Sequence, residues 1–298
     1  MRKPGATRRQ YRIIYGGLCS WLAGQLGRVP TVADATGDAL AAYLRHLERS
    51  GGRDGGGARP ATLRVYGAML RALCRELNGD QQALAVRPPR HRPGPPEAIT
   101  ERQWANLLRV PDLRTRAGRR DHAVLRVLGD LGLRGGELRA LAGRHLRRPR
   151  SDSPRRRLLV PGKGGAERQL AMPRACQQAV ESWLLVHPLA RRGEIDPDAP
   201  LFVRLGRHER LSPGPLSAGA VHDLVRRCAT EAGIPRRLAH PHQLRTFCAT
   251  RLLEAGIPLH QVSQMLGHAT LQTTARYAAL RSGWDEELAE MTERLERR

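Results

Sequence analysis

Apolar side chains recur at the three- and four-residue steps of an amphipathic helix in three early segments of the chain. These segments are residues 11–22, 40–47 and 63–77. Thr36 stands at an N-cap position before the second segment, and Pro60 stands where the first turn of the third tolerates proline. The pattern predicts a small all-helical unit over residues 1–86.

A proline-rich basic segment follows this unit. Residues 87–96 read RPPRHRPGPP, with five prolines and four basic residues. Because proline cannot continue a helix and biases the preceding residue toward extended backbone, we expect a stiff cationic linker over 87–98. A new helix should begin after Thr100, where Gln103 completes a capping box.

Residues 99–282 have the pattern of a mostly helical domain with one short β element. The extended-looking segments 158–161 and 167–172 flank the glycine-rich run 162–165, which predicts a hairpin. The expected fold class is therefore mainly α with a small β-sheet or hairpin. At the end, residues 283–298 space apolar side chains by four, three and four, among six carboxylates. This spacing predicts an amphipathic helix that packs on its own domain or on a neighbouring subunit.

Charge and composition narrow the class of partner. The 298 residues include 51 Lys+Arg against 28 Asp+Glu, a formal net charge of +23, which favours a polyanion such as DNA or RNA. Runs of 18 apolar residues do not occur, and residues 1–30 lack the apolar core of a signal peptide. The five cysteines are scattered without a CxxC pair, which argues against a disulfide framework or a zinc finger. We expect a cytoplasmic, nucleoid-associated protein without a membrane partner.

Lys163 is one of only two lysines beside 49 arginines, and it lies at the tip of the predicted hairpin. Lysine can be tuned into a general acid, whereas arginine does not release its proton, so a retained lysine suggests proton transfer. An ordinary surface lysine is the alternative. Arg134, in the run Gly132-Leu133-Arg134-Gly135-Gly136-Glu137, follows an apolar helix and could equally be a surface residue.

Four further candidates lie near the end of the chain. His242 and Arg245 share one face at the start of a predicted helix, which favours anion binding or a structural ion network. His268 follows a glycine that should cap a helix, and Tyr277 is the only tyrosine after residue 66. Alone, each is as easily a packing residue.

Together the candidates favour phosphoryl transfer without a metal or another cofactor. Two guanidiniums can bind the non-bridging oxygens of one phosphodiester. A tyrosine oxygen can attack phosphorus and conserve the bond energy in a covalent link, so that ATP is not required. A lysine can protonate the departing sugar oxygen.

The motif order resembles that of the tyrosine recombinase, or phage integrase, family, at the size of Xer-like recombinases. The motifs are Gly-Leu-Arg-x-x-Glu, Gly-Lys-Gly, His-x-x-Arg, Leu-Gly-His and a tyrosine nine residues later. This resemblance implies a site-specific recombinase with a helical core-binding domain and a mixed α/β catalytic domain, which close as a C-shaped clamp on double-stranded DNA. It also implies a tetrameric synapse, of this chain or with a related recombinase, in which segment 283–298 docks into a neighbouring protomer.

The resemblance implies a role for each candidate. Arg134 and Arg245 would clamp the scissile phosphate with His268 as a third donor, and Glu137 would hold the arginine and histidine side chains in place. Lys163 would be the general acid for the 5′-oxygen. His242 would assist proton transfer or phosphate binding, and Tyr277 would attack to leave a 3′-phosphotyrosyl link.

Two departures from the family pattern stand out. Thr246 replaces a frequent second histidine, which we interpret as local repacking, and Gly165-Ala166 replaces a frequent basic residue. Two alternative functions stay open: a type IB topoisomerase, which shares this chemistry but relaxes supercoils without synapsis, and a non-catalytic DNA-binding protein that kept the fold. A basic RNA- or ribosome-associated protein would explain the charge but not the motif spacing.

Overall fold

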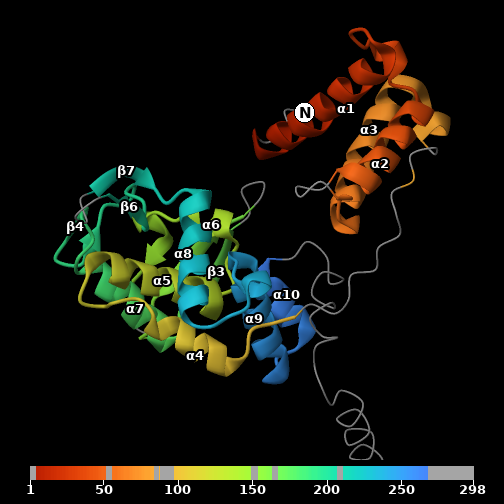
Figure 1. The fold of residues 1–298 in the computed structure, drawn as a ribbon. Helices are drawn as coiled ribbons and strands as arrows, with labels where there is room; N and C mark the ends of the chain where they lie inside the picture. The colour runs from red at the N-terminus through yellow and green to blue at the C-terminus, as the bar shows by residue number, and fades with distance from the viewer. Residues whose placement is uncertain are drawn as a thin grey trace, which may run out of the picture. The chain divides into compact units, whose positions relative to one another are not determined.

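The computed structural model describes residues 5–51, 56–83, 87, 97–148, 154–162, 167–206 and 211–267. The chain divides into two compact units, which we describe separately: an N-terminal unit of residues 1–94 and a second unit of residues 95–298 (Figure 1). Within the described residues, no helix combines the length and the apolar character needed to cross a membrane.

The N-terminal unit contains three α-helices in its described part. They are α1 (Gly5–Leu26), α2 (Gly37–Ser50) and α3 (Pro60–Ala83), with a 3-10 turn at Val32–Asp34 between the first two. The three predicted apolar stripes form one core, whose buried members include Ile14, Leu18, Leu40, Leu44, Leu63 and Leu70. The Thr36 hydroxyl accepts a hydrogen bond from the Ala39 N–H at 3.2 Å, which confirms the predicted cap of α2.

The second unit is mostly helical. Its α-helices are α4 (Glu101–Arg109), α5 (Arg116–Asp130), α6 (Gly135–Arg139), α7 (Arg174–Leu184), α8 (Ala218–Glu231), α9 (Pro241–Glu254) and α10 (Leu259–Leu266). Short 3-10 turns cover Gly143–His145 and Arg236–Leu238. The predicted capping box of α4 is present, because Thr100 and Gln103 exchange side-chain-to-backbone hydrogen bonds of 3.2 and 2.9 Å.

Helix α5 lies at the centre of this unit, packed against α7 and α9 (Figure 1). Its apolar residues are fully buried because helices cover it on more than one side: Ala123, Val124, Leu125, Val127 and Leu128. The turn that leaves α5 passes through Gly132 at φ +64° and leads directly into α6. The packed core thus fixes the segment that carries the Arg134 motif.

The predicted hairpin is present as the antiparallel pair β2 (Arg157–Pro161) and β3 (Glu167–Ala171), in a register that places Leu158 opposite Leu170. Strand β1 (Leu146–Arg147) adds a third strand beside β2. The overall class, mainly helical with small sheets, is confirmed.

The expectation of a single β element is wrong. Two further two-stranded sheets occur: β4 (Ala190–Arg191) with β5 (Glu194–Ile195), and β6 (Val203–Leu205) with β7 (Leu211–Pro215). Strands β4, β5 and β6 have two or three residues, too few to show apolar alternation, and β7 contains two prolines and a glycine, which argue against a strand. The β4–β5 turn also places Arg192 at φ +51°, a conformation that the sequence does not signal for arginine.

Candidate active site

Glu137 and Arg134 are joined by a local cap at the start of α6. The Arg134 N–H donates to Glu137 Oε2 at 2.9 Å, and Arg134 Nη1 donates to Oε1 at 2.8 Å. Glu137 occupies the third position of the helix, where a carboxylate can accept from the unpaired N–H groups of the first turn. The three-residue spacing in the sequence therefore creates this pair without help from distant parts of the chain.

Arg245 reaches the same place from α9. Its side chain is 1% exposed, and its two terminal nitrogens donate to the Gly132 and Leu266 carbonyls, both at 2.7 Å. Its Nη1 also lies 3.9 Å from Glu137 Oε2. A buried guanidinium is tolerated only when such acceptors surround it. The structure thus brings Arg134, Glu137 and Arg245 together from α6 and α9.

Two glycines allow this close approach. Gly132 has φ +64°, which side chains rarely adopt, and a Cβ atom there would lie 2.4 Å from the Leu266 side chain, so both observations favour glycine at this position. Gly267 caps α10 in the left-handed conformation at φ +66°, which confirms the predicted cap, and its carbonyl accepts from Arg134 Nη2 at 3.1 Å.

Arg168 of β3 also belongs to this cluster, and the sequence analysis missed it. Its Nη1 and Nη2 donate to Glu137 Oε1 and Oε2 at 3.1 and 2.8 Å, and its Nε donates to the Met265 carbonyl at 2.8 Å. The alternation of faces along the predicted strand could have pointed to Arg168. In a strand, alternate residues share a face, so Arg168 lies on the same face as buried Leu170 and needs an acidic partner inside the fold.

The Glu137 carboxylate is held ionised by its neighbours. Burial alone would raise the pKa of this group, but hydrogen bonds from Arg168 and from the Arg134 main chain and side chain outweigh burial, and the net pKa lies below its usual value. The cluster is therefore an ionic network at neutral pH.

His242 is exposed in the first turn of α9, one turn before Arg245. Thr246, which stands where the resemblance expects a second histidine, is buried, and its hydroxyl donates to the His242 carbonyl at 3.2 Å. Lys163, His268, Tyr277 and the segment 283–298 lie outside the described residues. In the chain, Lys163 belongs to the β2–β3 connection and His268 directly follows Gly267.

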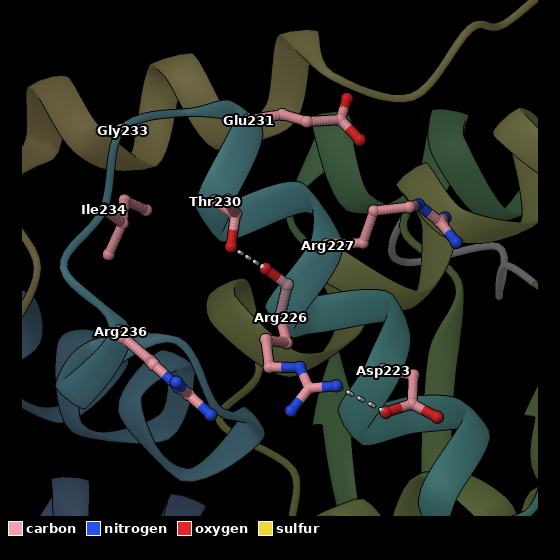
Figure 2. A pocket seen from close by; sticks show the side chains of 8 residues that line it. All are labelled: Asp223, Arg226, Arg227, Thr230, Glu231, Gly233, Ile234 and Arg236. Atoms are coloured by element: carbon pink, nitrogen blue, oxygen red, sulfur yellow. Dashed lines mark hydrogen bonds and ion pairs between the residues drawn. The ribbon is translucent and has the colours of Figure 1, made fainter.

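A separate hollow of about 790 Å³ opens beside α8 and the loop that follows it (Figure 2). It is lined by Asp223, Arg226, Arg227, Thr230, Glu231, Gly233, Ile234 and Arg236, none of which is a predicted site residue. Acidic and basic side chains alternate there, as in the Asp223–Arg226 pair at 3.6 Å drawn in Figure 2. The residues of this hollow do not form a constellation for phosphoryl transfer.

Among the described residues, no three His, Cys, Asp or Glu side chains gather closely enough to hold a metal ion.

Comparison with known proteins gives a consistent result. The profile of the phage integrase family matches residues 97–283. Tyrosine recombinase XerD of Xanthomonas axonopodis pv. citri is 35% identical over 280 residues, which cover 91% of this chain and 86% of the relative. Tyrosine recombinase XerC of Alcanivorax borkumensis is 35% identical over 222 residues, which cover 74% of this chain and 67% of the relative.

Solved structures share the fold. The Tn1549 transposon integrase in complex with transposon right end DNA has a TM-score of 0.67 at 18% identity, covering 99% of this chain and 95% of that one. The XerA recombinase has a TM-score of 0.52 at 20% identity, with coverage of 98% and 93%.

Proposed function

Since the chain belongs to the phage integrase family and is a tyrosine-type site-specific recombinase that cleaves and rejoins DNA, we propose that it cuts each strand through a 3′-phosphotyrosyl link formed by Tyr277. The observation that carries this proposal is the convergence of Arg134 and Arg245 on one carboxylate, Glu137, beside the end of α10. Tyr277 follows Leu266, the last residue of α10, by eleven residues in the chain.

Arg134 is the arginine best placed to meet a phosphate. Its side chain is 47% exposed, and its bonds to Glu137 and Gly267 occupy two of the five N–H groups of a guanidinium. Donors remain for a non-bridging oxygen. Buried Arg245 adds a fixed positive charge beside it, and charge aimed in advance at the reacting phosphate lowers the barrier without reorganisation.

The remaining candidates complete the reaction. The Tyr277 oxygen attacks phosphorus, the bond to the 5′-oxygen breaks, and Lys163 gives its proton to that leaving oxygen. His242 assists removal of the tyrosine proton, and His268 is a third donor to the phosphate. Attack of a 5′-hydroxyl on the phosphotyrosyl link reverses these steps and rejoins the strand, so neither a metal ion nor ATP is consumed.

Duplex DNA is the proposed partner of both units. The net charge of +23 supports it, and the Tn1549 integrase of similar fold is described in complex with DNA. In this proposal residues 1–86 and 99–282 close as a C-shaped clamp through the linker 87–98. Segment 283–298 docks into a neighbouring protomer of a tetrameric synapse, and the protein works in the cytoplasm at the nucleoid.

Covalent capture tests the nucleophile. The protein is incubated with fragmented genomic DNA, trapped with SDS, and the bound DNA is sequenced to find the site. A duplex of that site, nicked beside the scissile phosphate, should then give an SDS-resistant adduct that Tyr277→Phe abolishes while DNA binding persists. Tyr66→Phe, which removes a tyrosine hydroxyl in the N-terminal unit, is the control and should still form the adduct. An adduct that survives Tyr277→Phe would refute the assignment.

A further inference from the structure

The end of α10 is held by arginines from three different elements. Its last three carbonyls each accept one hydrogen bond from a different guanidinium, at 2.8, 2.7 and 3.1 Å. The pairs are Met265 with Arg168, Leu266 with Arg245, and Gly267 with Arg134. The last carbonyls of a helix have no partner within the helix and form its negative end, so cations are stabilised there.

Arg168 differs from the other two arginines in how its donors are used. Both of its terminal nitrogens bond the two oxygens of Glu137, and its Nε bonds Met265. All three nitrogens are thus committed inside the protein, and the side chain is only 15% exposed, against 47% for Arg134. Arg168 therefore connects β3 to α6 and α10 and is poorly placed to meet DNA.

We propose that Arg168 is a positioning residue for the phosphate-binding arginines, an inference that rests on the function proposed above. By its two bonds it fixes the orientation of the Glu137 carboxylate, and Glu137 in turn orients Arg134. By its bond to the Met265 carbonyl it also holds the end of α10. The carbonyls of the next two residues, Leu266 and Gly267, in turn orient Arg245 and Arg134.

Arg168 has a second effect, because it competes with Arg134 and Arg245 for the negative charge of the Glu137 carboxylate. A carboxylate bound in fork geometry by one guanidinium has less capacity to neutralise others. With Arg168 in place, Glu137 makes one side-chain bond to Arg134 and stays 3.9 Å from Arg245. Without Arg168, Glu137 is free to pair more closely with these two arginines and to draw them from the phosphate.

The competing explanation is that Arg168 acts by positioning Lys163, because both residues belong to the β2–β3 hairpin. Cleavage of three substrates distinguishes the two explanations: the ordinary phosphodiester, a methylphosphonate and a 5′-phosphorothiolate. A methylphosphonate lacks the charge that the arginines neutralise, so misplaced arginines should matter less for it. A 5′-phosphorothiolate has a leaving group that needs no protonation, so a misplaced general acid should matter less for it.

Arg168→Gln and the matched control Arg156→Gln are compared with wild type on these substrates, at the site found by covalent capture. Arg156 is a suitable control because it is 17% exposed and bonds Glu181 at 2.9 Å, away from the cluster. We expect Arg168→Gln to slow cleavage of the ordinary phosphodiester on the order of 10- to 100-fold. Its deficit should shrink several-fold on the methylphosphonate, persist on the phosphorothiolate, and leave DNA affinity unchanged. Arg156→Gln should cleave all three substrates like wild type.

Three results would overturn the proposal: no deficit, equal deficits on all substrates, or a deficit that disappears only on the phosphorothiolate. A readout without cleavage separates this proposal from the function itself. Orthovanadate, a phosphate analogue, is titrated by calorimetry into the full chain without DNA. Affinity should fall on the order of tenfold in Arg168→Gln and stay unchanged in Arg156→Gln. If wild type forms no adduct on any DNA, the proposed function fails, and equal vanadate affinities would then refute the role of Arg168 independently.

Discussion

Replacing Glu137 by glutamine keeps the shape of the side chain and removes its charge. The carboxylate is 10% exposed and accepts four hydrogen bonds, two from Arg134 and two from Arg168. Glutamine has one acceptor oxygen, and its NH₂ group would face guanidinium donors. The bonds to one of the two carboxylate oxygens are therefore lost, and the arginines lose their shared negative neighbour.

The cost follows from these contacts. A hydrogen bond to a charged group contributes about 1.5–3 kcal/mol, and removing one partner of a buried ion pair costs about 3–5 kcal/mol. Because Arg134 is half exposed and water can solvate it, the lower end applies, and we expect a loss of about 3 kcal/mol in the free energy of unfolding. For a unit of residues 95–298, this loss lowers Tm by about 6–12 °C.

Differential scanning calorimetry of the full chain checks this value, with Glu97→Gln as the control. Glu97 also pairs with an arginine, Arg237, but both side chains are more than half exposed, so its loss should leave Tm unchanged within error. The two variants giving equal Tm values at neutral pH would refute the reasoning.

The pH dependence provides a second check on Glu137. Its pKa in the folded state lies below the usual 4.5, so its stabilisation is fully present above that value and is lost as the pH falls through the lowered pKa. The Tm difference between wild type and Glu137→Gln should therefore narrow below about pH 4.5. A difference that stays constant down to pH 3 would contradict this account.

Four further predictions concern other parts of the protein. Gly132→Ala should cost about 2 kcal/mol or more of stability, because the residue has φ +64° and no room for a Cβ atom, whereas Gly135→Ala, in open space, should cost little; urea unfolding measures both. Lys163→Ala should cleave the ordinary phosphodiester about 10²- to 10⁴-fold more slowly, yet cleave a 5′-phosphorothiolate near the wild-type rate. Removal of residues 283–298 should spare DNA binding but reduce tetramers on DNA, measured by light scattering, and unaltered tetramers would contradict the docking role. Affinity for duplex DNA should fall about 10³- to 10⁵-fold between 50 and 200 mM salt if six to ten phosphates are contacted, which fluorescence anisotropy can follow.

The features of this fold that depend on residues close together in the sequence could be predicted from the sequence. The cap of α4 joins Thr100 to Gln103, and the cap of α2 joins Thr36 to Ala39, each across three residues. The sheets β4–β5 and β6–β7 could not be predicted, because β4, β5 and β6 have only two or three residues and β7 reads Leu-Ser-Pro-Gly-Pro, which is not a strand pattern.

The site shows the same division. The motif order made Arg134, Glu137 and Arg245 candidates through a family resemblance, and the structure brings the three side chains together. No local pattern links the first two to a residue more than a hundred positions away. Arg168 lies 31 residues from Glu137 and is one of 49 arginines, so the sequence does not indicate that these two side chains pair. The pairing depends on the folded structure, in which Arg168 of β3 bonds Glu137 of α6 and the end of α10.

The charge balance of the cluster explains how three arginines can lie close together and still attract a phosphate. Three guanidiniums against one carboxylate leave two positive charges, and the C-terminal end of α10 offsets roughly half a charge of these. Glu137 bonds Arg168 through both oxygens, bonds Arg134 through its side chain and main chain, and lies 3.9 Å from Arg245. Arg134 is the half-exposed arginine of the cluster, so the excess positive charge is most accessible there. In the reaction proposed above, a phosphodiester gains negative charge on its non-bridging oxygens as the tyrosine attacks, so a cluster that is still positive at this edge would stabilise the transition state more than the ground state.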